Sequence, residues 1–83
     1  MADKLTEPQR RILLASEPNE RTGDGGFGVE LNTAGDIQAA KALERKQFGT
    51  IEGLGGSFAP LYFNNWYGLR ERSTHLSQDR LED

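Results

Sequence analysis

Cysteine is absent from this sequence of 83 residues, and histidine occurs only once. The first absence excludes disulfide bonds and thiolate zinc sites. A single histidine argues against a histidine metal centre and against a serine–histidine nucleophile. The longest uninterrupted apolar run, Ile12–Ala15, falls far short of the roughly 20 residues that span a membrane. No apolar stretch follows the N-terminal charges, as a secretory signal would require. These absences predict a soluble, cytoplasmic protein that uses no metal, cofactor or membrane.

An excess of positive charge is also missing. The sequence holds 10 basic and 13 acidic residues, a formal net charge of −3. A sequence-independent nucleic-acid binder usually carries a basic excess, because phosphate contacts supply most of its affinity. Only residues 32–75 hold more cations than carboxylates, five against four. Any electropositive face is therefore expected from these five: Lys41, Arg45, Lys46, Arg70 and Arg72.

Helix signals are clear near the N-terminus. Thr6 and Gln9 match a capping box, and Pro8 suits the first turn of a helix. The apolar run that follows supplies a core-facing stripe. Pro18 ends this helix at or before the preceding residue, because the residue before a proline is pushed out of the helical region.

A loop, a short strand and a second helix are predicted next along the chain. Residues 18–26 are loop by composition, and residues 27–31 alternate apolar with small or polar side chains, which predicts a short strand. A second helix is predicted over 36–46, with Asn32 or Thr33 as its N-cap. Small and apolar residues recur along it at helical spacing, so one narrow face is expected to pack against the core.

A hairpin follows the second helix. The pair Gly55–Gly56 separates two β-prone runs within residues 50–63, which is typical of a hairpin turn. Pro60 cannot donate a ladder hydrogen bond, so it marks an edge position or a bulge. Beyond the hairpin, Asn64 or Asn65 can cap a last helix over 66–72.

The C-terminal residues 76–83 are polar and predict a frayed tail, which leaves a single domain over 1–75. His75 is expected on the surface. No pair of side chains forms a defensible general acid and base, so the sequence predicts no catalytic residue and no enzyme.

Three segments resemble the winged helix-turn-helix of MarR-like regulators. Residues 42–51 are similar to the end of a recognition helix that enters the wing, Phe63–Leu69 to the return strand and the turn after it, and Leu5–Gln9 to the start of the first helix. The chain departs from the family at 25–31, where a glycine-rich segment replaces the positioning helix. The resemblance implies an α+β, winged-helix-like domain with three helical segments, a short strand and a β-hairpin wing.

That fold places the predicted core on one side of each element. Its members share apolar or small side chains: Leu5, Ile12, Leu13, Val29, Leu31, Ile37, Ala40, Leu43, Phe48, Ile51, Leu61, Phe63, Trp66 and Leu69.

Two functions stay open at this point. The first is a nucleic-acid-binding regulator of transcription that contacts double-stranded DNA. In a winged-helix frame the 36–46 helix would enter the major groove, where arginine and glutamine read base edges. The candidate residues are Gln38, Lys41, Arg45, Lys46, Arg70 and Arg72. The simpler interpretation of that helix is a solvated face with cations placed favourably near its C-terminus.

The alternative is a protein-interaction module, such as a small phage-type or accessory protein that binds a larger host complex. The negative net charge and the absence of cations at the Gly55–Gly56 tip favour it. Phe58, Tyr62 and Tyr67 are the candidate anchors, because hot spots of protein interfaces favour aromatic residues. The chain is too short for the extra dimerisation helices of MarR-like proteins, so a monomer or a weak homodimer is expected.

Overall fold

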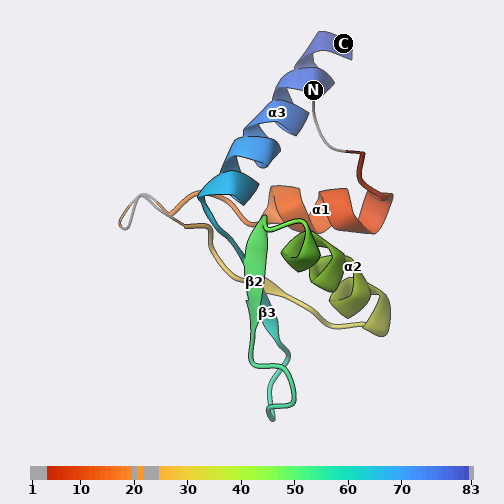
Figure 1. Cartoon of the computed structure of the whole chain (residues 1–83), viewed down its shortest axis with the longest axis vertical. Coiled ribbons are helices and arrows are strands. Elements are labelled where there is room, and N and C mark those ends of the chain that lie inside the picture. Colours follow the sequence, from red (N-terminus) through yellow and green to blue (C-terminus); the bar gives the residue numbers. More distant parts are fainter. Residues whose placement is uncertain (1–3, 20, 22–24, 83) are drawn as a thin grey trace.

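The computed structural model describes residues 4–19, 21 and 25–82 (Figure 1). Three helices and a three-stranded antiparallel sheet alternate along the chain, which confirms the predicted α+β class with its short strand and hairpin. The elements are α1 (Glu7–Ala15), β1 (Val29–Glu30), α2 (Ala34–Arg45), β2 (Gly49–Glu52), β3 (Leu61–Asn64) and α3 (Trp66–Glu82). Figure 1 shows α1 and α2 side by side against the sheet, α3 at one end and the tip of the hairpin at the other.

Both predicted N-caps are present. At α1, the Thr6 hydroxyl accepts from the Gln9 backbone N–H at 3.4 Å, and Gln9 Oε1 accepts from the Thr6 N–H at 3.1 Å. At α2, the Thr33 hydroxyl accepts from the Asp36 N–H at 3.1 Å. These bonds satisfy N–H groups that have no partner inside the helix, so the two helix starts follow from the local sequence.

The sheet has the order β1-β3-β2, so β3 is its central strand. β2 pairs with β3 from Gly49↔Asn64 to Glu52↔Leu61, and residues 53–60 close this hairpin. β1 is shorter than the predicted 27–31 and pairs through Val29 and Glu30 only. The predicted pairing of the two strands is confirmed, but the strands are shorter than predicted, and residues 53–60 form the loop in place of a tight turn at Gly55–Gly56.

The core corrects the sequence prediction at β3. Side chains alternate between the faces of a strand, and β3 turns Tyr62 and Asn64 inward, both buried. Leu61, expected in the core, is 36% exposed, and Phe63 is half-buried. The predicted core therefore contained the residues of the outer face of β3, Leu61 and Phe63, in place of those of its inner face. The buried apolar residues are Ile12, Leu13, Leu31, Ala39, Ala40, Leu43 and Tyr62, with Leu5, Val29, Ile37, Phe48 and Ile51 packed against them.

Helix α3 differs from its prediction in length and in face. It continues to Glu82 instead of ending near Arg72, so the predicted frayed tail is helical up to that residue, and position 83 lies outside the described residues. Trp66, expected in the core, is 54% exposed, whereas His75, expected on the surface, is buried. The His75 Nε2 atom lies 3.2 Å from Glu71 Oε2, one helical turn away. Among residues 66–77, α3 therefore buries Gly68 and His75, while Leu69, expected in the core, and Leu76 are half-buried.

The start of α3 is fixed to the end of α2. Asn65 is the cap: its Oδ1 accepts from the Gly68 N–H at 3.0 Å, and its Nδ2 donates to the Gln47 carbonyl at 2.9 Å. The Asn65 backbone N–H donates to the Phe48 carbonyl at 2.9 Å. Four residues thus tie the two helix ends together across 18 positions of sequence.

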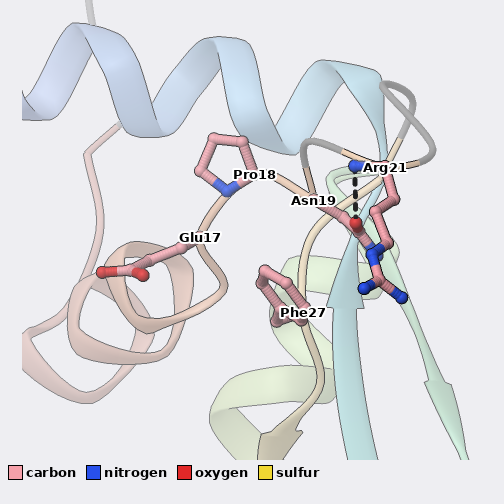
Figure 2. A pocket seen from close by; sticks show the side chains of 5 residues that line it. All are labelled: Glu17, Pro18, Asn19, Arg21 and Phe27. Atoms are coloured by element: carbon pink, nitrogen blue, oxygen red, sulfur yellow. Dashed lines mark hydrogen bonds between the residues drawn. The ribbon is translucent and has the colours of Figure 1, made fainter.

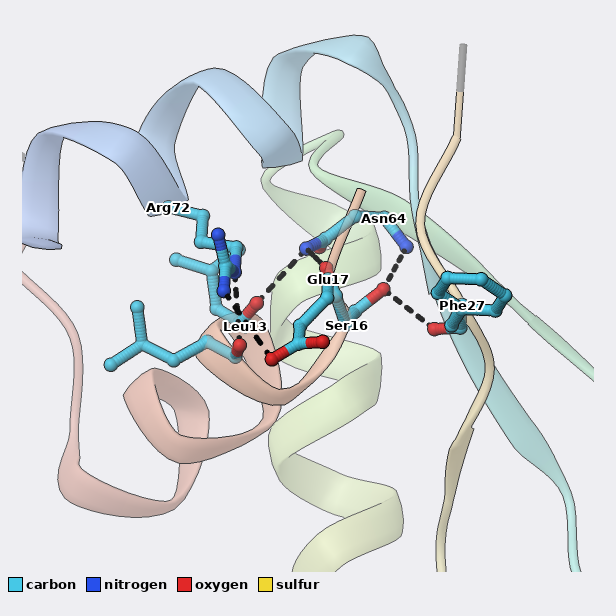
Figure 3. Close-up of polar contacts among 7 residues, drawn as sticks. Leu13, Ser16, Glu17, Phe27, Asn64 and Arg72 are labelled. Carbon is cyan, nitrogen blue, oxygen red and sulfur yellow. Dashed lines mark hydrogen bonds and ion pairs between the residues drawn. The ribbon is translucent and has the colours of Figure 1, made fainter. Parts of the chain in front are cut away.

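The C-terminus of α1 is satisfied by side chains from far along the chain (Figure 3). The Asn64 Nδ2 donates to the Leu13 and Ser16 carbonyls at 2.9 and 3.0 Å, and the Arg72 Nε donates to the Leu14 carbonyl at 2.9 Å. The last carbonyls of a helix have no partner within it, and a cation near them interacts favourably with the helix dipole. α1 has no basic residue in its own last turn, so Arg72 supplies that charge from α3.

Ser16 extends this network to the segment before β1. Its hydroxyl donates to the Phe27 carbonyl at 2.8 Å and accepts from the Asn64 N–H at 3.0 Å. The Gly26 N–H donates to the Asn64 carbonyl at 2.9 Å. Ser16 and Asn64, both buried, therefore hold α1, β3 and the loop before β1 at one point.

One buried hydroxyl has no hydrogen bond. The Tyr62 Oη atom has no partner among the described residues and lies directly under Gly49, where a Cβ atom would approach it to 2.5 Å. Burial, reinforced by the negative charge of Glu44, raises the pKa of Tyr62 above its ordinary value of 10.0. The folded protein therefore strongly favours the neutral phenol.

This shifted pKa predicts a loss of stability at alkaline pH. Above about pH 10 the unfolded chain releases the Tyr62 proton while the folded chain retains it, so the free energy of unfolding falls by about 1.4 kcal/mol per pH unit. Below that pH the contribution is fully present. Urea unfolding between neutral pH and about pH 11 measures the slope.

The matched control for this slope is Tyr62→Phe, which removes the titrating group and the unpaired hydroxyl together. In this variant the free energy of unfolding is expected to lose the decrease above pH 10 that Tyr62 causes. At neutral pH it is expected to be higher by about 1 kcal/mol, since an unpaired buried hydroxyl is costly. An unchanged slope in Tyr62→Phe would contradict the assignment.

Candidate nucleic-acid interface

The outward face of α2 carries three of the predicted site residues. Gln38 and Arg45 are exposed and Lys41 is half-buried, and their spacing of three and four places them on one stripe of the helix. The opposite face buries Ala39, Ala40 and Leu43 against α1 and the sheet. The set Gln38, Lys41 and Arg45 is called the α2 stripe below.

The carboxylates of α2 are held by partners outside this stripe. Asp36 Oδ1 lies 2.5 Å from the Arg11 guanidinium of α1. Glu44 Oε2 accepts from the Ile51 N–H of β2 at 3.1 Å, which also occupies a donor on that edge strand. The α2 stripe therefore presents an amide and two cations, and the exposed Glu44, three residues after Lys41, is the neighbouring carboxylate, engaged by the β2 backbone.

The remaining cations of the prediction divide between surface and interior. Lys46, the C-cap of α2, and Arg70 of α3 are exposed, and the bonds of Asn65 to residues 47 and 48 bring their two helix ends together. Arg72 points inward instead. Its side chain is only 17% exposed, and besides its bond to Leu14 its Nη2 lies 4.0 Å from Glu17. Arg72 stabilises the end of α1 and is removed from the candidate interface.

The candidates for protein contact divide in the same way. Tyr62 is fully buried, which corrects its prediction as a surface anchor, because the register of β3 turns it into the core. Phe58 is 89% exposed on the loop of the hairpin, near the exposed Leu54. Tyr67 is 60% exposed on the first turn of α3.

The exposed ring of Trp66 was not predicted from the sequence, because its spacing from Leu69 suggested a shared core face. Its centroid lies 5.2 Å from that of Tyr67, with the planes at 82°, and the Arg70 guanidinium lies 5.4 Å over the Trp66 ring. The signal that could have found it is the Asn65 cap. It makes Trp66 the first residue of α3, while Gly68 is the residue buried beside β3.

The tip of the hairpin differs chemically from the α2 stripe. A shallow hollow of about 250 Å³ there is lined by the hairpin loop and the two strand ends, with Phe58 and Leu61 among its apolar members. Glu52 is the charged residue of its lining. The tip offers apolar surface and a carboxylate, and residues 53–60 contain no cation.

A larger hollow, of about 620 Å³, lies beside the loop after α1 (Figure 2). Glu17, Pro18, Asn19, Arg21 and Phe27 line it. Figure 2 shows the Glu17 carboxylate directed away from the Arg21 guanidinium, and the Asn19 side chain accepts from the Arg21 backbone N–H at 3.0 Å. Its charged groups do not converge on one point, so this hollow assembles no catalytic or binding constellation.

Two kinds of site are not found in the part of the chain that the structure describes. No group of three or more acidic or histidine side chains is placed to hold a metal ion. No helix within residues 4–19, 21 and 25–82 is long and apolar enough to cross a membrane.

Comparisons of this chain with protein-family models, curated proteins and solved structures find no match.

Proposed function

We propose that this protein is a small nucleic-acid-binding regulator that contacts double-stranded DNA through the α2 stripe. The observation that carries the proposal is the segregation of charge on α2. Asp36 and Glu44 are engaged by Arg11 and by the β2 backbone, while Gln38, Lys41 and Arg45 face outward together. Arginine and lysine donate to phosphates and guanine edges, and glutamine donates to and accepts from adenine.

The net charge of −3 sets the expected strength. Few cations are available for phosphate contacts, and the loop of the hairpin adds none, so non-specific affinity is weak. Because each phosphate contact adds about 1 to the slope of log affinity against log salt, this slope is expected to be small. Binding at low salt in the micromolar range is the expected behaviour of such a surface.

The direct test is an anisotropy titration of labelled duplex DNA at several salt concentrations. The double variant Lys41→Ala/Arg45→Ala is expected to reduce the slope of log affinity against log salt by about 2, since each phosphate contact contributes about 1. Both side chains lie outside the core cluster, so the fold should be retained.

The matched control removes the same charge elsewhere. Lys4→Ala/Arg21→Ala deletes two exposed cations remote from α2 in sequence and is expected to leave the salt slope unchanged. If both double variants reduced the salt slope equally, the effect would arise from the net charge of the protein and not from the α2 stripe. No binding by the unmodified protein at a concentration of about 10⁻⁵ M would reject the proposal.

A protein-interaction module is the second candidate function. The exposure of Phe58 and Leu54 at a tip without cations favours it, because an exposed aromatic ring with apolar neighbours is a typical anchor of a protein interface. Capture of partners from an extract with and without nuclease separates the two functions. Partners retained after nuclease treatment support the second and not the first.

A further inference from the structure

Two aromatic rings and a guanidinium form one exposed group on the first turn of α3. Trp66, Tyr67 and Arg70, here called the aromatic corner, combine an edge-to-face ring pair with a cation stacked over the Trp66 ring. Trp66 is 54% exposed and Tyr67 60%. Large aromatic side chains are usually buried in a domain of this size, so their exposure calls for an explanation.

The aromatic corner is held rigidly in place. The Asn65 cap fixes the first turn of α3, and Gly68 is buried so closely against β3 and Phe48 that the helix cannot rotate to bury the rings. The exposed orientation is therefore set by the backbone contacts of α3. A surface held in advance loses little conformational entropy when it binds a ligand.

The chemistry of the aromatic corner fits a nucleobase and its phosphate. A base presents a flat π-face that stacks on tryptophan or tyrosine, and such stacking does not depend on base identity. An arginine stacked on a ring keeps its N–H donors for a phosphate. Lys46 lies on the neighbouring helix end, joined through the bonds of Asn65 to residues 47 and 48.

The contrast with the hairpin tip favours nucleic acid over protein here. The tip exposes aliphatic and aromatic surface beside a carboxylate, whereas the aromatic corner exposes rings beside the Arg70 cation. Glu71 lines the hollow next to Tyr67 and Arg70, but it is half-buried and lies 3.2 Å from His75. Rings with cations complement stacked bases and negative phosphates.

We propose that the aromatic corner binds an unpaired base together with its phosphate, so that the ligand of this protein contains a single-stranded segment. This proposal rests on the function proposed above. It deepens that function because the bonds of Asn65 to residues 47 and 48 join the end of α2 to the start of α3, which carries the rings. A strand that leaves a duplex at the end of α2 is therefore expected to meet the rings.

The sequence contains one tryptophan, so the intrinsic fluorescence of the protein reports directly on Trp66. Four probes are titrated at low salt: a fully paired DNA duplex, the same duplex extended by single-stranded thymidines, a thymidine oligomer and a uridine oligomer. The extended duplex is expected to quench Trp66 and to bind at least about fivefold more tightly than the paired duplex. The two oligomers show whether DNA, RNA or both supply the unpaired base.

The variants are Tyr67→Ala and Trp66→Leu, followed by anisotropy of labelled probes, with Phe58→Ala as the exposed-ring control on the hairpin loop. The first two are expected to remove the preference for the extended duplex and to leave affinity for the paired duplex unchanged. Phe58→Ala is expected to change neither. Circular dichroism checks that each variant retains its helices.

The outcomes separate the two proposals. Equal affinity for paired and extended duplex, with unchanged Trp66 fluorescence, overturns the aromatic corner while the α2 stripe stands. No binding of any probe rejects both. A third outcome is that a protein partner is captured from a nuclease-treated extract by the unmodified protein but not by Tyr67→Ala, and that no nucleic acid changes the Trp66 fluorescence. This outcome assigns the aromatic corner to protein binding and overturns the proposal.

Discussion

Replacing Gly68 with alanine is expected to lower the free energy of unfolding by about 3 kcal/mol. A Cβ atom at this position would overlap the Phe48 carbonyl oxygen and lie 2.7 Å from Asn64 Oδ1. Both atoms are fixed, the first by its bond from Asn65 and the second by the buried cap on α1. The helix must therefore move away from the sheet, although glycine to alanine normally favours a helix by about 1 kcal/mol.

The control is another helical glycine. Gly35 in the first turn of α2 is exposed, and an added Cβ would meet nothing closer than the Thr33 hydroxyl at 3.8 Å. Gly35→Ala is expected to be neutral or to stabilise by up to about 1 kcal/mol. Urea unfolding of both variants measures the difference in sign. A neutral Gly68→Ala would mean that α3 does not sit against Phe48.

Asn64→Ala is expected to cost about 3 kcal/mol as well. The Asn64 amide satisfies the Leu13 and Ser16 carbonyls, and a buried acceptor that loses its donor costs about 1–3 kcal/mol. The loss also opens a small cavity beside Gly68. Thermal or urea unfolding measures the effect, and Asn32→Ala, at an exposed asparagine, is expected to stay within about 0.5 kcal/mol of the unmodified protein.

A double-mutant cycle tests whether this network acts as a unit. Ser16→Ala removes the hydroxyl that bridges Asn64 and Phe27. Because both single changes break the same network, the double variant is expected to be less damaging than the sum of the two by about 1 kcal/mol. Full additivity would contradict the coupling.

Local signals predicted the starts of α1 and α2 and the pairing of β2 with β3, because a cap and its first turn, or two strands joined by a short loop, lie close together in the sequence. Thr6, Thr33 and the β2–β3 hairpin are of this kind. Local signals did not predict which side of α3 is buried. Its buried side includes Gly68 and His75, which give no apolar stripe to follow.

The candidate site shows the same division. The periodicity of α2 placed Gln38, Lys41 and Arg45 on one stripe, as the structure has them. No pattern in the sequence distinguishes Arg70, which is exposed, from Arg72 two positions later, which caps the end of α1. That difference depends on contacts between α3 and a helix more than 50 residues earlier.

The capping of α1 also has a consequence for how the chain folds during synthesis. The donors for the Leu13 and Leu14 carbonyls come from residues 51 and 58 positions later. α1 leaves the ribosome first, yet its last turn stays open to water until β3 and the start of α3 have followed. A nine-residue helix is marginal by itself, so we expect α1 to become stable late, together with the C-terminal half of the chain.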